Sequence, residues 1–212
     1  MKPFTTHRGI AAPLLRDNID TDQIIPSREM KTVGKTGLSE GLFAGWRYLT
    51  PNARDLNPDF ILNKPAFQNA TILVACANFG CGSSREHAVW ALAEYGIRAV
   101  IAESFGSIFR ANAIRNGVLP VSLPRASIAR LATDLQDSAQ PPQIEIDLNK
   151  CVLLMNSESE AVIMSFQLAD AEREMLLNGF DPVDLTQTHS AKIEDFIRDH
   201  RIKRPWIYKD EI

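Results

Sequence analysis

The sequence predicts an α/β protein built on a mixed sheet, in a layered β/β/α arrangement of three layers. From 71 to 123, apolar strand-like runs alternate with helical patterns, which is typical of parallel strands joined by right-handed crossovers. From 143 to 166, three short strands follow one another closely, which favours antiparallel hairpins. A sheet with both kinds of connection and helices packed outside it suits this layered architecture.

The first element is a strand within about 4–15, ending at Arg16-Asp17. The acidic run Asp17–Asp22 follows and is rich in turn residues. One interpretation is a solvated loop whose aspartates bond to their own backbone. The apolar Ile24-Ile25-Pro26 comes directly afterwards, however, and draws the loop back toward a packed layer.

The region from Ser27 to Gly45 contains several glycines and two lysines, which predicts a long mobile loop. A short helix at about 39–43 is expected to interrupt it. From Pro51 to Pro65, prolines and asparagines predict an irregular surface passage.

The centre of the chain is expected to hold six alternating elements. They are a strand at 71–76, a helix at 84–95, a strand at 98–103, a helix at 105–116, a strand at 118–123 and a helix at about 126–137. Gly117 is placed to end the second helix at its C′ position. Pro120 indicates an edge strand or a bulge, because proline cannot donate to a sheet ladder.

The C-terminal region is expected to contain three strands and two helices. The strands are at 143–148, 151–155 and 161–166, and the helices at about 168–178 and 191–200. Alternating charges on these helices indicate solvated faces. We therefore expect a single domain over 1–212, with a C-terminal helical extension at about 167–212.

Composition narrows the class of protein. Hydrophobic residues make up 45% and charged residues 23% of the 212 residues, as in ordinary globular proteins. A net charge of -3 gives no reason to expect nucleic acid as a partner. The chain has neither an apolar run long enough to span a membrane nor an apolar leader, so we expect a cytoplasmic protein. Its three cysteines are too few and too widely spaced to predict a disulfide framework or a metal cluster site.

The chemistry is expected in Asn78–His87, between the first central strand and the helix after it. Gly80 and Gly82 allow a sharp turn and a close approach to a ligand. Ser83-Ser84-Arg85-Glu86 fits the capping-box pattern, with Ser83 as the N-cap. Hydroxyls, a guanidinium and free N–H groups at a helix N-terminus suit an anion. A capped helix after a glycine turn has the same pattern, so both interpretations stay open here.

Two motifs carry a resemblance to a known family. Gly80-x-Gly82-Ser83-Ser84-Arg85-Glu86-His87 resembles the substrate loop in the swivelling domain of the aconitase superfamily. Asn18–Pro26 matches a second motif, and the segments Met30-Lys31-Thr32 and Thr36-Gly37 extend the match. Together they resemble the small subunits of 3-isopropylmalate dehydratases, over most of the chain and in order. The resemblance implies the swivelling β/β/α fold.

The resemblance also implies roles for residues of both motifs. It implies Ser83 as the catalytic base, with Asp22 supporting it or the charges of a partner. Ser84 and Arg85 would bind a substrate carboxylate, and Thr21 belongs to the same substrate-binding group. The implied specificity loop runs from Ser27 to Gly37 and contains Arg28, Met30, Lys31, Thr32 and Val33. Within it, Met30 and Val33 would offer apolar contact to an isopropyl group.

The implied reaction is incomplete within this chain. A serine hydroxyl with a pKa near that of water, about 15.7, lies about 8 to 9 pKa units above neutral pH. That gap is roughly 11 to 12 kcal/mol, whereas a helix terminus supplies about 0.3 to 2 kcal/mol. A strong Lewis acid is needed, and this chain has no ligand set for one. The resemblance implies a separate large subunit with a [4Fe–4S] cluster, in a heterodimer or heterotetramer, and a small di-acid substrate.

The implied activity is a hydro-lyase that converts 2-isopropylmalate to 3-isopropylmalate through 2-isopropylmaleate, in leucine biosynthesis. Homoaconitase or a related alkylmalate dehydratase is an alternative, because Glu29-Met30 departs from the usual pair there. A non-catalytic anion-binding module is another, although the loop lacks a third glycine and a Walker lysine. Cys81 is better explained as a packed side chain than as a nucleophile. For His87, packing and a role in the site are both open.

Overall fold

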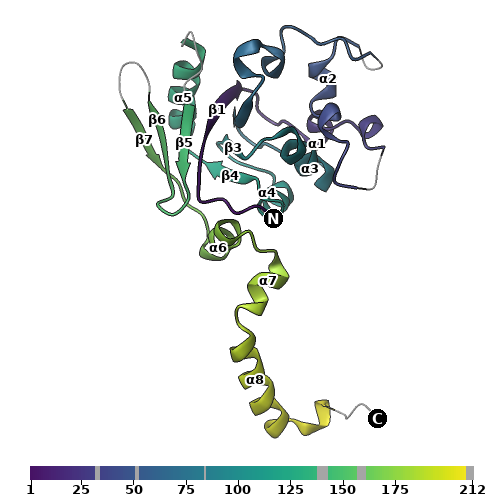
Figure 1. Cartoon of the computed structure of the whole chain (residues 1–212), viewed down its shortest axis with the longest axis vertical. Helices are drawn as coiled ribbons and strands as arrows, with labels where there is room; N and C mark the ends of the chain where they lie inside the picture. The colour runs from purple at the N-terminus through teal and green to yellow at the C-terminus, as the bar shows by residue number, and fades with distance from the viewer. Residues whose placement is uncertain (32–33, 51–52, 84, 138–142, 157–160, 209–212) are drawn as a thin grey trace.

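The computed structural model describes residues 1–31, 34–50, 53–83, 85–137, 143–156 and 161–208. Its centre is a seven-stranded sheet in the order β4-β3-β2-β1-β5-β6-β7 (Figure 1). The strands are β1 (Thr6–Leu14), β2 (Ala70–Ala75), β3 (Ala99–Ala102), β4 (Leu119–Ser122), β5 (Gln143–Asp147), β6 (Val152–Asn156) and β7 (Ala161–Ser165). Strands β1 to β4 pair in parallel, whereas the pairs β1–β5, β5–β6 and β6–β7 are antiparallel. The predicted α/β class with a mixed sheet is confirmed.

The described part of the chain also contains helices. They are α1 (Thr21–Ile24), α2 (Ala44–Arg47), α3 (Glu86–Tyr95), α4 (Ser107–Arg115), α5 (Arg125–Asp137), α6 (Asp170–Asn178), α7 (Pro182–Gln187) and α8 (Ser190–Lys203). The central elements match the prediction within two residues at each end. Gly117 has φ +75° after α4, as expected at C′, and Pro120 lies on the edge strand β4. Helix α7 was not predicted.

Each central strand contributes to two hydrophobic cores, one on each face of the sheet. On β2, Leu73 and Ala75 belong to the first core, whereas Ile72 and Val74 belong to the second. This separation follows from the alternation of side chains along a strand. The first core is covered by α3 and by the segments that follow β1, and the second by α5, α6 and the antiparallel strands. Burial on both faces explains why the central strands are continuous apolar runs.

Between Ser27 and Gly45, the described residues 27–31 and 34–45 have more structure than the predicted mobile loop. It contains two 3-10 turns, Ser27–Glu29 and Ser39–Gly41, and the start of α2. Leu38, Leu42 and Phe43 are fully buried in the first core. The predicted helix at about 39–43 is therefore a single short turn followed by α2. Buried apolar side chains fix the second half of this segment to the body of the protein.

The C-terminal helices differ in how they contact the rest of the protein. Helix α6 packs on the body through buried Met175 and Leu176, and its Glu172 carboxylate accepts two hydrogen bonds from the Arg110 guanidinium of α4. Helices α7 and α8 contain no buried residue, and Figure 1 shows them extending away from the sheet. Within the described part of the chain, no helix is both long and apolar enough to cross a membrane.

Candidate active site

The candidate site lies at the carboxyl edge of the parallel strands. Strands β1, β2 and β3 end at Leu14, Ala75 and Ala102, and the loops that follow them meet there. Sheets of this kind bind ligands outside the carboxyl ends of their strands. Both predicted motifs are in these loops, because one follows β1 and the other follows β2.

Backbone hydrogen bonds join the two motifs. The Gly80 amide donates to the Ile19 carbonyl at 2.7 Å, and the Thr21 amide donates to the Cys81 carbonyl at 2.9 Å. Between these contacts, Asp20 and Cys81 form an isolated parallel bridge. Two loops far apart in the sequence therefore form one unit, whose geometry is set by the backbone rather than by flexible side chains.

Glycines allow this close packing at two positions. Gly80 has φ +73°, and a Cβ atom there would lie 2.1 Å from the Cγ atom of Phe109. A Cβ atom on Gly106 would lie 2.6 Å from the Gly80 carbonyl oxygen. Phe79 also contacts Phe109 edge-on, with ring centroids 5.2 Å apart. The glycine loop therefore rests directly on an aromatic layer.

The predicted capping box at Ser83 is wrong. Helix α3 begins at Glu86, and its N-cap residue is Arg85, which is extended (φ −78°, ψ 120°) and makes no side-chain cap. The Glu86 carboxylate instead accepts a hydrogen bond of 2.9 Å from Asn116 Nδ2. Because the chain is still extended at Arg85, the helix starts too late for Ser83 to cap it. Ser83 is exposed in the turn before the helix.

A capping box does exist in the other motif. The Gln23 amide donates to Asp20 Oδ1 at 2.7 Å, and the Asp20 amide donates to Gln23 Oε1 at 3.0 Å. This reciprocal pair starts the short helix α1. It fixes the turn from which Asp22 projects toward the second motif.

The structure pairs Arg85 with Asp22, a contact that was not predicted, since the resemblance assigned Asp22 to Ser83 or to a partner. Arg85 Nη1 donates to Asp22 Oδ1 at 2.6 Å and to Ser27 Oγ at 2.7 Å. The Arg85 and Asp22 side chains are 30% and 54% exposed, so a ligand can reach the pair. The sequence pattern did not indicate Ser27 as a site residue. Its only signal was its position at the start of the implied specificity loop.

The remaining predicted residues of the two motifs are placed differently. Thr21 is 1% exposed, and its Oγ1 atom has no hydrogen-bond partner within the described residues. Its amide helps to hold the glycine loop, as described above. Ser84, Thr32 and Val33 lie outside the described residues. Their predicted roles therefore stay predictions.

The specificity segment contains a buried carboxylate, Glu29, that lies between two arginines. Glu29 is 8% exposed, and its Oε2 atom lies 2.7 Å from Arg54 Nη2. That hydrogen bond raises the pKa of the Arg54 guanidinium. Arg28 Nε lies 3.5 Å from Glu29 Oε1, so Arg28 is also directed toward this carboxylate. Met30 packs against the first core, whereas Lys31 is exposed.

A small pocket adjoins the glycine loop. It encloses about 190 Å³ and is lined by Gly80, Cys81, Gly82, Gly106, Ser107, Ile108 and Phe109. Ile108 is 53% exposed and gives the pocket an apolar side chain at the start of α4. The α4 side of this pocket was not predicted from the sequence. The pattern of α4 predicted a helix but not what it would face.

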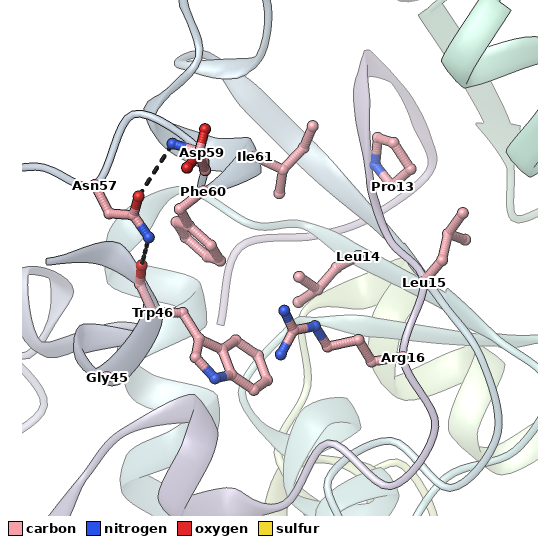
Figure 2. Close-up of a pocket in the computed structure, with 10 residues that line it drawn as sticks. All are labelled: Pro13, Leu14, Leu15, Arg16, Gly45, Trp46, Asn57, Asp59, Phe60 and Ile61. Carbon is pink, nitrogen blue, oxygen red and sulfur yellow. Dashed lines mark hydrogen bonds between the residues drawn. The ribbon is translucent and has the colours of Figure 1, made fainter. Parts of the chain in front are cut away.

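A larger hollow of about 400 Å³ lies after the end of β1 (Figure 2). It is lined by Pro13, Leu14, Leu15, Arg16, Gly45, Trp46, Asn57, Asp59, Phe60 and Ile61. The Arg16 guanidinium stacks over the Trp46 ring, 4.5 Å from its centroid, as Figure 2 shows. No residue of Asp20–Gln23 or Gly80–Arg85 lines this larger hollow. We therefore place the candidate active site at the smaller pocket, despite its size.

The described residues do not fit a metal cluster. They include no group of three or more His, Cys, Asp or Glu side chains that could hold a metal ion. All three cysteines are free, and burial raises the pKa of the Cys76 thiol. His87 packs against Trp90, with ring centroids 4.8 Å apart. This contact favours the packing interpretation of His87.

Comparisons with known proteins agree with this geometry. The aconitase C-terminal domain family matches residues 1–126. The 3-isopropylmalate dehydratase small subunit of Cupriavidus necator is 52% identical over 210 residues, covering 99% of this chain and 100% of that protein. The protein of the same name from a Polaromonas species is 44% identical, covering 98% and 97%.

Among solved structures, the 3-isopropylmalate dehydratase of Methanocaldococcus jannaschii matches with a TM-score of 0.63 and 28% identity. The match covers 90% of this chain and 99% of that one. The resemblance in sequence and the swivelling α/β fold are therefore both confirmed. The chain belongs to the aconitase C-terminal domain family and, within it, to the 3-isopropylmalate dehydratase small subunits.

Proposed function

We propose that this chain is the small subunit of a hydro-lyase that converts 2-isopropylmalate to 3-isopropylmalate through 2-isopropylmaleate. The observation that supports this most is the cluster of Arg85, Asp22 and Ser27 at the carboxyl edge of the sheet. Arg85 lies two residues after Ser83 in the chain. A cation held by an anion, beside an exposed hydroxyl, suits a substrate with carboxylate groups.

Arg85 is proposed to bind a substrate carboxylate. Its Nη1 atom donates to Asp22 and Ser27, whereas its Nε and Nη2 atoms donate no hydrogen bond to any other described residue. Asp22 therefore orients the guanidinium and leaves two parallel donors for a ligand. Planar paired donors match the geometry of a carboxylate, which a lysine cannot reproduce.

Ser83 is proposed to take the proton from the carbon next to that carboxylate during dehydration, and to return a proton during rehydration. Hydroxide leaves the neighbouring carbon in the first step, so a double bond forms between the two carbons. In the second step, water adds with the opposite orientation and the hydroxyl group changes position. The exposure of Ser83 in the turn before α3 is consistent with direct contact with substrate.

The specificity segment is proposed to favour a substrate without a third carboxylate. Of the cations described in this segment, Lys31 is exposed, whereas Arg28, which has the planar donors suited to a carboxylate, lies against the buried Glu29. Met30 offers an apolar surface nearby in the chain, and Ile108 offers another at the pocket. These contacts suit an isopropyl group better than the additional carboxylate of a homoaconitase substrate.

A larger partner subunit is proposed to supply the [4Fe–4S] cluster and the Lewis acidity that this chain lacks, in a heterodimer or heterotetramer. We also propose that residues 1–212 form one swivelling domain with a C-terminal helical extension, in the cytoplasm. The reasoning for the partner is energetic, since a helix terminus and one arginine leave most of the proton-transfer barrier in place.

The test is anaerobic reconstitution of this chain with a large subunit, followed by isomerisation assays on several alkylmalates. We expect turnover of 2-isopropylmalate only by the pair. Ser83→Ala should abolish turnover without loss of thermal stability, because Ser83 caps no helix. A folded Ser83→Ala variant with a normal kcat would remove Ser83 from the proposed mechanism.

A further inference from the structure

The segment 27–41, described at 27–31 and 34–41, contains the implied specificity loop and is bound near both ends by residues at the two ends of α3. At its start, Ser27 accepts a hydrogen bond from Arg85, the residue directly before α3. Near its end, three consecutive amides donate to Glu94, in the last turn of the same helix. Since a helix rises about 1.5 Å per residue, the two attachment points lie about 14 Å apart along its axis. The helix therefore sets the distance that the segment must span.

The attachment to Glu94 is made of short hydrogen bonds. The amide of Gly37 donates to Glu94 Oε1 at 2.6 Å, and the amides of Leu38 and Ser39 donate to Oε2 at 2.6 and 2.8 Å. Gly37 has φ +81° and Leu38 is in the right-handed helical region, a succession that points consecutive amides at one acceptor. Leu38 is also fully buried. The carboxylate thus fixes the point at which the segment enters the core.

The electrostatics of Glu94 agree with this contact. Desolvation pushes the pKa of the Glu94 carboxyl upward, but the three backbone donors outweigh it and hold the pKa below its usual value. The group is therefore charged at neutral pH, when its hydrogen bonds to the amides are strongest.

A second contact secures the middle of the segment. Lys35 Nζ donates to Asn116 Oδ1 at 3.2 Å, and the same oxygen accepts from Trp90 Nε1 at 3.1 Å. Asn116 Nδ2 in turn donates to Glu86, the first residue of α3. The segment is therefore aligned along α3 by contacts near Ser27, at Lys35 and at Gly37–Ser39.

We propose that Glu94 is a positioning residue for substrate choice: by binding the amides of Gly37, Leu38 and Ser39, it holds the specificity segment in register with the helix that begins beside Arg85. This inference rests on the proposed function. It also predicts that Glu94 contacts the segment and not the substrate. Loss of the carboxylate should then alter which alkylmalate is preferred more than how fast the preferred one reacts.

The first experiment needs no activity. Hydrogen exchange of the full chain is measured by mass spectrometry on peptides that contain residues 37–39, for wild type, Glu94→Gln and Glu94→Ala. We expect exchange there to accelerate about 10- to 150-fold in Glu94→Ala, the change that loss of one hydrogen bond to a charged group produces. Glu94→Gln should give a smaller increase. Glu174→Gln, at an exposed glutamate of α6, is the matched control and should change nothing.

The second experiment uses the reconstituted pair and compares kcat/KM for 2-isopropylmalate with that for an alkylmalate bearing a smaller substituent. We expect Glu94→Ala to raise KM for 2-isopropylmalate and to reduce the ratio of the two kcat/KM values about tenfold, with kcat nearly unchanged. Unchanged exchange at residues 37–39 would show that Glu94 does not hold these amides and would overturn its positioning role. Faster exchange with an unchanged ratio would overturn the role in substrate choice. If the wild-type pair turns over no alkylmalate, the proposed function and the role in substrate choice both fail. Hydrogen exchange then still tests whether Glu94 holds residues 37–39.

Discussion

Replacing Arg85 with lysine separates structural support from substrate binding. In the structure, a single nitrogen of Arg85 serves both Asp22 and Ser27. A lysine ammonium can make these contacts and keeps the charge, so the ion pair should survive the change. Because the pair is partly exposed, it contributes about 0.2 to 1 kcal/mol to the free energy of unfolding. We therefore expect the Arg85→Lys variant to lose less than about 1 kcal/mol of stability.

Substrate binding should respond differently to the same change. The lysine lacks the two remaining donors of the guanidinium, which we assign to the substrate carboxylate. A hydrogen bond to a charged group contributes about 1.5 to 3 kcal/mol, so kcat/KM should fall about 10- to 150-fold. Steady-state kinetics of the reconstituted pair, with thermal unfolding of the chain, measure both effects. Arg198→Lys is the control, since Arg198 forms a similar exposed pair with Asp195 on α8. An unchanged kcat/KM in Arg85→Lys would refute the assignment of these donors.

Three further predictions concern the fold. Gly80→Ala should lower the free energy of unfolding by about 2 to 5 kcal/mol in urea titrations, because it adds a strained φ and a clash with an aromatic ring; Gly34→Ala, with open space around it, should be nearly neutral. Deleting residues 189–212 should change that free energy by less than about 0.5 kcal/mol, since α8 buries no residue; a large loss would contradict this. The hydrogen bond from arginine lowers the pKa of Glu172, so its stabilisation is fully present above the unfolded value of about 4.3 and is lost as the pH falls through the lower folded value. The free energy of unfolding of Glu172→Gln should therefore be lower than that of wild type at neutral pH, and the two values should converge as the pH falls. A difference that stays constant with pH would contradict this role of Glu172.

The sequence predicts the parallel half of the sheet well, because its strands are buried on both faces and its helices end at recognisable residues. The Ser83 error has a specific physical cause. Ser83 and Glu86 have the spacing of a capping box, but the backbone of Arg85 is extended and delays the helix. Asp20 and Gln23 have the same spacing and do form the box. Spacing alone could not distinguish the two cases, since the difference lies in backbone dihedral angles set by long-range contacts.

Helix α7 could have been predicted from its first residues. Asp181 accepts hydrogen bonds from the amides of Val183 and Asp184, and Pro182 occupies the first helical position. Both are known signals of a helix start. The contacts of Glu94 and Arg54 were not predictable in this way. Each joins residues that are distant in the sequence, and nothing in local composition indicates which partner will be found.

The position of β1 has a consequence for synthesis of the chain. This strand is made first, yet it pairs with β2 on one side and with β5 on the other, so its second neighbour emerges only after residue 143. Until then, an assembled parallel half would present the Thr6–Ile10 part of β1 as an unpaired edge. Unpaired edges of this kind promote association between nascent chains. A ribosome-bound chain that stops before β5 should therefore depend on chaperones more than the complete protein does.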